Sequence, residues 1–357
     1  MKEVAIKEIC TKGSSSLKQK ELLPEGKYPV YGASGIAGYL DTFHQESNYI
    51  GIVKDGSGIG RVAFYPEKTS LIGTMQYILP KKGFNIRYIG YCLQSLDLSK
   101  YKQGAAIPHI YFRDYGERIV KVTDDENEQL SIVSRLDAAF AHIDALKANA
   151  EKQLSEARQL FQAELAECMR PKEGWEEKTL GSICKIINGR AYSKDEMLKQ
   201  GKYRLLRVGN FFTNDSWYYS DLELEEDKYC EKGDLLFAWS ASFGPRIWDG
   251  EKVIYHYHIW KMVCSSVIDK YFMFYWLDSD ELKKQTMSNL HGATMAHITK
   301  GIIEAALVSY PSIELQYQIV SRLDALSANI KKLEELQRKT LAECDALKQA
   351  MLREVFE

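Results

Sequence analysis

The sequence predicts an α+β protein in which two globular domains alternate with two long helices that pair as an antiparallel coiled coil. The segment from Ile132 to Ala138 recurs residue for residue from Ile319 to Ala325. Each copy opens a run of about 40 residues that lacks Gly and Pro and repeats apolar residues at spacings of three and four, which is typical of coiled-coil helices. Segments rich in Gly and aromatic residues precede both runs. The duplicated element is therefore globule plus helix, a pseudo-two-fold internal repeat.

The first globular domain is predicted at residues 1–128. Runs of apolar and aromatic residues typical of strands occur at residues 49–54, 62–65 and 74–79, and a helical pattern follows at residues 86–96.

The first long helix is predicted at residues 129–170, and it ends before Pro171 because proline cannot continue a helix. About 40 residues at about 1.5 Å each make a rod of roughly 60 Å, far longer than a usual globular helix. An apolar stripe on such a rod needs a partner, and the duplicate supplies one. Two long helices packed on separate cores would leave the duplication unexplained. The stripe comprises Leu136, Ile143, Leu146, Ala150, Leu154, Ala157, Leu160 and Phe161.

The second globular domain is predicted at residues 171–315. Strands are expected at residues 203–208, 235–239 and 253–264, and a helix at residues 270–288. The second long helix follows at residues 316–357, and its apolar stripe comprises Leu323, Leu326, Ile330, Leu333, Leu336, Leu341, Cys344, Leu347 and Met351.

Two pairs of short, similar sequence segments occur at corresponding places in the two globular domains. The segment GAAIPHI at residues 104–110 corresponds to GATMAHI at residues 292–298, and each lies shortly before its long helix. The segment GSGIG at residues 56–60 corresponds to SASFG at residues 240–244, and each ends a predicted strand. Because the domains differ far more than the helices do, we infer that the helices share one role and the domains have separate ones.

The composition is that of an ordinary soluble protein, with 45% hydrophobic and 27% charged residues in 357. No apolar run approaches the roughly 18 residues of a membrane span, and the start of the sequence has no signal-peptide core. The seven cysteines are an odd number without a CxxC pair, which favours reduced thiols in the cytoplasm. The net charge is -2, yet residues 1–113 carry 15 Lys and Arg against 9 Asp and Glu, a modest basic excess.

Motifs for catalysis are missing from the sequence. There is no GxxxxGKS/T phosphate loop, and the glycine-rich GSGIGR at residues 56–61 misses GxGxxG because its last position is Arg61. No Asp or Asn precedes Pro-Pro and an aromatic residue, so an adenine-methylating loop is absent. His256 and His258 lie two apart on a predicted strand and would share one face, but no Cys or acidic residue lies at ligand spacing. We therefore predict no catalytic residue and no metal site, and interpret the histidines as a structural pair.

An ordered set of motifs runs along essentially the whole chain. Its members are GKYPVYGASGIAGYLD at 26–41, the GSGIGR and SASFGPR turns, the two GAxxxHI segments, GWEEKTLGSICKIINGR at 174–190, and EQLSIVSRLD and LQYQIVSRLD at the starts of the helices. Together they resemble the specificity subunit of Type I restriction-modification systems. Two departures affect the domain edges. VTDDENEQ lacks the proline that YPSIELQ keeps before the second helix, and the first domain starts without the GW of Gly174 and Trp175.

The resemblance implies a non-catalytic reader of DNA. In this family two target recognition domains each read one half of a split target in double-stranded DNA, and the helices set the distance between the halves. The helices also hold two methyltransferase subunits, and motor-nuclease restriction subunits can join them. S-adenosylmethionine is bound by the methyltransferase partner, so the resemblance implies no cofactor in this chain.

Candidate DNA contacts are polar residues in the glycine-containing turns that interrupt apolar strands. Base edges are read best by Arg, Lys, Asn, Gln, Ser and Thr on loops or helix starts, and phosphates by Lys, Arg and main-chain amides. In the first domain the candidates are Ser34, Lys54, Ser57, Arg61 and His109. In the second they are Arg190, Arg207, Asn210, Ser242, Arg246 and Thr294. We interpret Trp217, Trp239, Trp248 and Trp260 as core residues rather than base-stacking groups.

Two other classes of function are weighed against this one. A stand-alone DNA methyltransferase fused to its recognition part would need catalytic motifs that the sequence lacks. A coiled-coil adaptor protein would explain the long helices, but not two unlike globular domains with matching turns.

Overall fold

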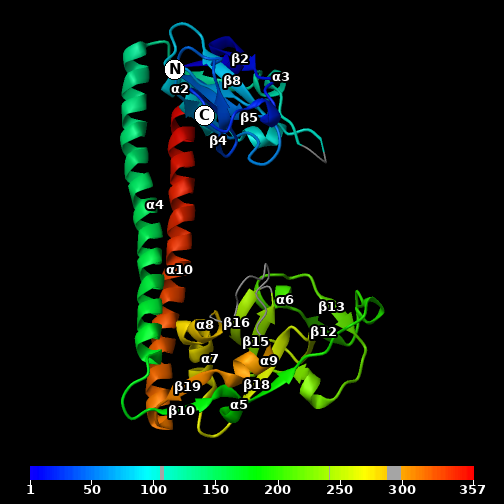
Figure 1. The fold of residues 1–357 in the computed structure, drawn as a ribbon. Coiled ribbons are helices and arrows are strands. Elements are labelled where there is room, and N and C mark those ends of the chain that lie inside the picture. Colours follow the sequence, from blue (N-terminus) through cyan, green and yellow to red (C-terminus); the bar gives the residue numbers. More distant parts are fainter. Residues whose placement is uncertain (105–107, 241, 288–298) are drawn as a thin grey trace. The chain divides into compact units, whose positions relative to one another are not determined.

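The computed structural model describes residues 1–104, 108–240, 242–287 and 299–357 (Figure 1). Within these residues the chain forms two compact units. Unit 1 combines Met1–Lys152 with Leu336–Glu357, and unit 2 comprises Gln153–Glu335. Each long helix therefore contributes one part to unit 1 and the other part to unit 2.

Unit 1 contains three sheets in its described residues. The largest is antiparallel, with the order β2-β8-β5-β6, and α2 packs against it. A smaller sheet has the order β4-β3-β7, in which β3 and β7 run parallel, and β1 pairs with β9. The elements are β1 (Lys2–Ala5), α1 (Ile6–Ile9), β2 (Cys10–Ser14), β3 (Tyr28–Gly32), β4 (Gly35–Leu40), β5 (Tyr49–Val53), β6 (Val62–Tyr65), β7 (Ser70–Leu71), β8 (Met75–Pro80), α2 (Ile86–Ser95), α3 (Phe112–Tyr115) and β9 (Ile119–Val122).

Unit 2 contains three sheets in its described residues too. Their orders are β11-β18-β15-β16, β13-β12-β17-β14 and β10-β19, and β12 and β17 run parallel. The elements are β10 (Glu176–Thr179), α5 (Leu180–Ile183), β11 (Cys184–Asn188), β12 (Tyr203–Leu206), α6 (Val208–Phe212), β13 (Tyr218–Ser220), β14 (Tyr229–Cys230), β15 (Leu235–Ser240), β16 (Ser242–Ile247), β17 (Val253–Tyr255), β18 (Ile259–Cys264), α7 (Lys270–Asp278), α8 (Asp280–Met287), α9 (Lys300–Ala305) and β19 (Leu307–Tyr310).

The two units repeat one plan, which confirms the predicted duplication of globule plus helix. The order β2-β8-β5-β6 matches β11-β18-β15-β16, with strands taken from the same places in the chain. Helix α2 corresponds to α7, and α1 to α5. In both units the first strand pairs antiparallel with the strand that directly precedes the long helix.

The long helices α4 (Glu126–Met169) and α10 (Ile313–Phe356) have 44 residues each. Both begin three residues before the predicted starts at 129 and 316. For α4 the reason is a local cap, because Asp125 Oδ1 accepts a hydrogen bond from the Asn127 backbone N–H with an O···N distance of 2.8 Å.

Ion pairs fix the direction of the helix pair within each unit. In unit 1 Asp144 pairs with Lys348 at 2.5 Å, and Lys147 pairs with Asp345 at 2.8 Å. Moving forward along α4 therefore means moving backward along α10. In unit 2 the corresponding ion pairs are Arg158–Glu334 at 2.8 Å and Glu164–Arg322 at 2.7 Å. The helices are antiparallel in both units, as predicted.

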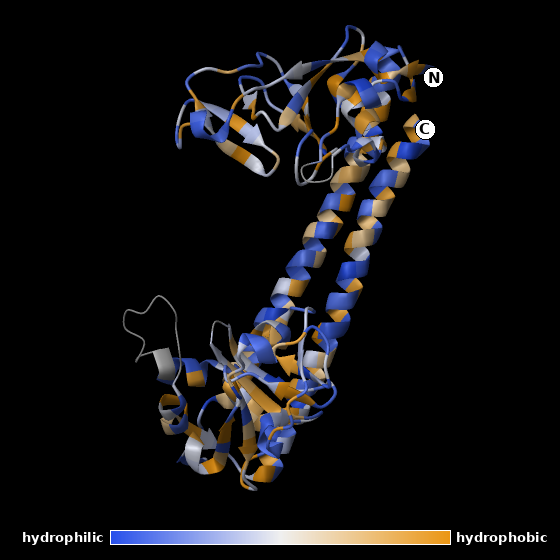
Figure 2. Cartoon of the chain, turned by 90° about the vertical axis from the view of Figure 1, so that its right-hand side faces the viewer, coloured by the Kyte–Doolittle hydropathy of each residue, from blue (hydrophilic) through white to orange (hydrophobic). Residues whose placement is uncertain are grey.

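Part of the predicted apolar stripe lies outside the helix seam. Ile143, Ala150 and Cys344 are buried, as expected. Four leucines of the stripe are half or more exposed, and hydrophobic residues interrupt the polar surface of both helices in Figure 2. Two paired helices bury only a narrow seam, so a wider stripe stays partly uncovered. The four are Leu146, Leu160, Leu336 and Leu347.

Three predicted elements of the second globular domain are corrected by the structure. Strand β12 ends at Leu206, because Arg207 is the N-cap of α6. The single strand predicted at residues 253–264 is two strands, β17 and β18, separated by a turn. The helix predicted at residues 270–288 breaks at Ser279. The Ser279 hydroxyl donates to Trp276 O at the end of α7 and accepts from the backbone N–H of Glu281 in α8.

Each unit has a core between one four-stranded sheet, β2-β8-β5-β6 in unit 1 and β11-β18-β15-β16 in unit 2, and one helix. Unit 1 buries Ile50 and Ile78 from the sheet against Tyr88 of α2, and Phe356 of α10 joins them. Unit 2 buries Trp260 and Phe237 against α7. Burial of each Ile or Phe side chain among these contributes about 1.5–3 kcal/mol. The seven cysteines are free thiols. Within the residues described, the helices are too short or too polar to cross a membrane.

Candidate nucleic-acid interface

The loop between β5 and β6 forms the centre of the candidate surface in unit 1. It is closed at its base by hydrogen bonds between Val53 and Arg61 and between Gly60 and Val53, with N···O distances of 3.0 and 2.8 Å. Gly60 has a φ of +86°, and a Cβ there would lie 2.8 Å from the backbone nitrogen of Ser99. Only glycine can occupy this position without strain. The glycine-rich motif GSGIGR is therefore a tight turn, as predicted.

One carboxylate organises the polar residues of this loop. Asp55 Oδ1 lies 2.6 Å from His109 Nδ1, and Asp55 Oδ2 lies 3.8 Å from Lys54 Nζ. The backbone supports the contact, because Ile110 N–H donates to Lys54 O at 2.9 Å. Asp55 was not predicted. Its partner His109 is 54 residues away in sequence, and no local pattern links the two.

Arg61 connects the loop to the turn between β3 and β4. Its Nη2 donates a hydrogen bond to the carbonyl oxygen of Ala33, and Ala33 directly precedes the exposed Ser34. Ser57 is exposed near the tip of the β5–β6 loop. The structure thus brings together the five residues predicted in the first domain, on three connections of one unit.

In unit 2 the candidates Arg207, Asn210 and Arg246 gather around the short helix α6. The exposed Arg207 guanidinium lies 5.3 Å from the ring centroid of Tyr218. Asn210 Nδ2 donates to two backbone carbonyls of the following loop, both at 2.8 Å. Arg246 Nη1 donates to Phe211 O at the end of α6 with a distance of 2.6 Å. Arg246 and Asn210 therefore hold α6 and its loop, and Arg207 remains accessible.

The other candidates of unit 2 have different settings. Ser242 is exposed at the start of β16. Arg190 forms a two-fold hydrogen bond with Glu196, at 3.0 and 2.6 Å, and this pairing lowers the pKa of Glu196 to about 2. Both terminal nitrogens of Arg190 are thus occupied by a local contact. Thr294, with the GATMAHI segment, lies outside the described residues.

The two histidines lie in the turn between β17 and β18, not on a strand. His256 N–H donates to Leu206 O at 2.9 Å, and the ring centroids of His256 and His258 are 4.8 Å apart. Burial, the nearby His258 and Arg207 lower the pKa of His256 to about 4, so its ring is neutral near pH 7. No cluster of three or more metal-ligating residues occurs in the part of the chain described. Of the tryptophans predicted to be core, Trp248 and Trp260 are buried, whereas Trp217 and Trp239 are half-buried.

In both units some of the candidates lie at the carboxyl ends of a parallel pair of strands. In unit 1, β3 leads into the turn of Ala33 and Ser34, and β7 leads towards Thr74, whose carbonyl accepts from the Lys54 backbone N–H at 3.0 Å. In unit 2, β12 leads into Arg207 and α6, and β17 leads into His256. Sequence patterns did not predict this arrangement, because the two-residue strand β7 and the three-residue strand β17 are too short to show a period.

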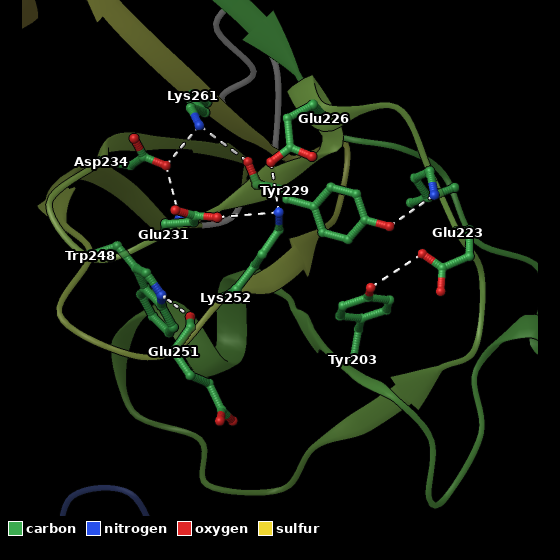
Figure 3. Close-up of polar contacts among 11 residues, drawn as sticks. Tyr203, Glu223, Glu226, Tyr229, Glu231, Asp234, Trp248, Glu251, Lys252 and Lys261 are labelled. Carbon is green, nitrogen blue, oxygen red and sulfur yellow. Dashed lines mark hydrogen bonds and ion pairs between the residues drawn. The ribbon is translucent and has the colours of Figure 1, made fainter.

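The amino ends of β12 and β17 carry mainly acidic residues, in contrast to the candidate surface at their carboxyl ends (Figure 3). Lys252 Nζ, just before β17, pairs with Glu226 at 2.6 Å and Glu231 at 3.2 Å. Tyr203, which begins β12, donates its hydroxyl to Glu223 at 3.2 Å. Carboxylates outnumber lysines in this cluster, so it repels a phosphate backbone. The surface of unit 2 suited to DNA is therefore at the other ends of these strands.

Comparison with known proteins agrees with this division into two units. A family model described as the Type I restriction modification DNA specificity domain matches residues 1–156 and 172–343. A Type I restriction enzyme specificity subunit of Methanocaldococcus jannaschii is 24% identical over 393 residues, which cover 97% of this chain and 89% of that protein.

Two solved structures share the fold. A chain from a type I R-M system, solved to explain its complex assembly and conformational transition, has a TM-score of 0.77 at 16% identity, with 99% of this chain and 97% of that chain covered. The HsdS subunit from Thermoanaerobacter tengcongensis has a TM-score of 0.54 at 16% identity, with coverages of 99% and 96%.

Proposed function

Because the chain belongs to the Type I restriction-modification DNA specificity family, we propose that its two units each read one half of a bipartite target in double-stranded DNA. One observation carries this proposal. The candidate surfaces occupy the same topological position in both units, at the carboxyl ends of a parallel strand pair. Loops from several strands converge there on a rigid sheet, which suits the reading of base edges. The side chains differ between the two surfaces, so the two half-sites differ in sequence.

The exposed candidates read bases, and the others orient them. Ser34 and Ser57 in unit 1, and Arg207 and Ser242 in unit 2, are exposed and have donors suited to base edges. Lys54 adds a positive charge for a backbone phosphate. Asn210, Arg246 and Arg190 are already bonded within the unit and hold the reading elements in place.

Two methyltransferase subunits dock at equivalent positions on the long helices. In unit 1, Leu130 and Leu347 are 54% and 50% exposed. Their duplicates in unit 2, Tyr317 and Leu160, are 56% and 58% exposed. Large apolar side chains left exposed on a helix surface favour binding to a partner, and duplicated positions give two equivalent seats.

We assign no catalytic residue and no cofactor to this chain. Methyl transfer from S-adenosylmethionine belongs to the methyltransferase subunits, and DNA translocation and cleavage belong to motor-nuclease subunits where these join. We propose the cytoplasm as the place of action of this chain, in keeping with its seven free thiols.

Methylome sequencing of a strain that expresses the chain with methyltransferase subunits tests this function. We expect one target split by an unread spacer. Duplexes with one half-site scrambled then separate the contributions of the two units to DNA affinity. Arg207→Ala should weaken binding to duplexes that keep the half-site read by unit 2, and should not weaken it where that half-site is scrambled. The matched control is Arg204→Ala, which removes an arginine within β12, near the acidic end of that strand, where it pairs with Glu251. An uninterrupted target, or equal losses for both variants, would overturn the proposal.

A further inference from the structure

A buried glutamine joins each long helix to its globular part in the same way. In unit 1, Gln129 Oε1 accepts a hydrogen bond from the Asn85 backbone N–H at 2.7 Å. Its Nε2 donates to Gly83 O and to Thr123 O, both at 3.0 Å. The side chain is fully buried, and its amide thus uses both donors and its acceptor within the unit.

Gln316 repeats this contact in unit 2. Its Oε1 accepts from the Asp269 backbone N–H at 2.8 Å, and its Nε2 donates to Val267 O and Pro311 O at 3.0 and 2.9 Å. This side chain is fully buried too. Asp269 is the N-cap of α7, as Asn85 is the N-cap of α2. Each glutamine therefore binds the start of α2 or α7, the helix whose residues share the main core of its unit.

A second contact lies eight residues further along each long helix. Tyr91 of α2 donates its hydroxyl to Asp137 of α4, and Tyr275 of α7 donates to Asp324 of α10, the latter at 2.6 Å. Burial and the hydrogen bond to Asp137 raise the pKa of Tyr91 to about 12, so its hydroxyl keeps its proton at any working pH. Eight residues correspond to about 12 Å along a helix. Two attachment points at this separation fix both the position and the direction of one helix against the other.

We propose that Gln129 and Gln316 are positioning residues that set the spacer length of the DNA target. This inference rests on the proposed bipartite function, in which the long helices define the distance between half-sites. The glutamine fixes where along its length the long helix meets the globular part. If the hydrogen bonds of this glutamine are lost, the recognition surface can shift relative to the long helix. The complex can then bind DNA with a spacer one base pair longer or shorter.

The test is the substitution Gln129→Glu in the full complex with methyltransferase subunits. The glutamate has the same shape, but its carboxylate faces the carbonyls of Gly83 and Thr123 and cannot donate to them. Burial without a cation raises a carboxyl pKa, so the protonated form regains one donor at low pH. Binding is measured on duplexes with the native spacer and with spacers one base pair longer and shorter, at about pH 8 and about pH 5.5. Gln318→Glu, at an exposed position of α10, is the matched control for charge.

We expect the preference for the native spacer to fall from about tenfold to about threefold or less at the higher pH, and to recover at the lower pH. Wild type and Gln318→Glu should keep their preference at both pH values. Equal losses on all spacers would mean a purely structural role and would overturn the inference. If the glutamate variant does not fold, Gln129→Met removes the polar group without adding charge, and it should weaken the preference for the native spacer equally at both pH values. A wild-type complex indifferent to spacer length would instead refute the bipartite function itself.

Discussion

Asp55 Oδ1 lies 2.6 Å from His109 Nδ1 and joins two connections of unit 1 that are 54 residues apart in sequence. The same carboxylate lies 3.8 Å from Lys54 Nζ. A negative charge on a surface meant for DNA weakens the attraction of phosphates. Its presence is understandable if it orients the two donors beside it, because a fixed donor discriminates between bases and a mobile one does not.

Asp55→Ala should therefore raise non-specific DNA binding and lower specificity. Removal of the charge favours phosphates, while His109 and Lys54 lose their common partner. We expect the ratio of specific to non-specific affinity to fall about tenfold, in line with the loss of one charge-assisted hydrogen bond. Titrations with target and random duplexes at one salt concentration measure this ratio. Asp41→Ala, an exposed position of the same unit, makes the same charge change and should leave the ratio unaltered.

Exchange of residues 1–128 for the matching domain of a relative should change one half of the target and leave the other intact. The graft must preserve the packing of Ile132 and Phe140 of α4 and of Phe356 of α10, because these side chains complete the core of unit 1. Methylome sequencing reports both halves at once. A hybrid with both half-sites altered would contradict the assignment of one half-site to each unit.

Lengthening both helices should lengthen the spacer. Four residues inserted near Ala148–Ala150 of α4 and four at the facing point of α10, near Glu343, add about 6 Å and just over one turn to each helix. At about 3.4 Å per base pair this corresponds to about one or two extra base pairs. Sites with the old spacer should be methylated poorly, because DNA deformation costs of order 1–6 kcal/mol. Sequencing of methylated sites measures the gap, and an active complex that keeps the old spacer would disprove the prediction.

The stability of unit 2 should fall below about pH 6.5, in part through His256. Its pKa is lowered from 6.5 to about 4 by burial, by His258 and by Arg207, and it also packs against Tyr192 and Tyr257. Unfolded chains bind the proton first as pH falls, so stability is full above pH 6.5 and decreases until about pH 4. The loss attributable to this residue is about 2 kcal/mol, given its partial exposure.

Tryptophan fluorescence during urea unfolding isolates this effect, because the six tryptophans of the chain all lie in unit 2. His256→Gln should flatten the dependence of the unfolding free energy between about pH 7 and pH 4.5. His142→Gln, at an exposed position of α4, should leave it unchanged. Equal pH dependence in wild type and His256→Gln would rule out the contribution.

Replacement of one exposed leucine by a charged residue should abolish the binding of one methyltransferase subunit. Leu347→Asp acts on the seat in unit 1 and Leu160→Asp on the equivalent seat in unit 2, and the double variant should bind none. Native mass spectrometry counts the bound subunits. Exposed surface substitutions seldom change stability by more than about 0.5 kcal/mol, so the chain itself should remain folded. Gln349→Asp, two residues from Leu347, is the control, and a single variant that still binds two subunits would exclude its leucine from a seat.

The features predicted well from the sequence are those whose apolar pattern repeats many times. The helices α4 and α10 were located to within three residues, because their pattern repeats over about a dozen turns. Short elements were missed for the opposite reason. Helix α6 has five residues, and the turn of His256 to His258 interrupts a run that reads as a single strand.

The candidate site was predicted by residue type, but not by contact. Turn chemistry selected Arg61 and His109, whereas their partners Ala33 and Asp55 depend on how distant segments pair. One contact did have a local signal. Ser193 and Glu196 form the S-x-x-E pattern of a capping box, which indicates an ordered turn beside Arg190.

The composition of unit 1 has a consequence for its synthesis. Its core includes the fully buried Phe356, whose ring centroid lies 5.1 Å from that of Tyr88. Residues 336–357, which include Phe356, are translated only after the whole of unit 2. Ribosomes add about 5–20 residues per second, so the first 152 residues wait roughly 10–40 s for their missing helix. Unit 2 is continuous in sequence and is synthesised in that interval. The part of the protein made first is thus completed last, and nascent chains expose Tyr88 and its neighbours to chaperones or aggregation meanwhile.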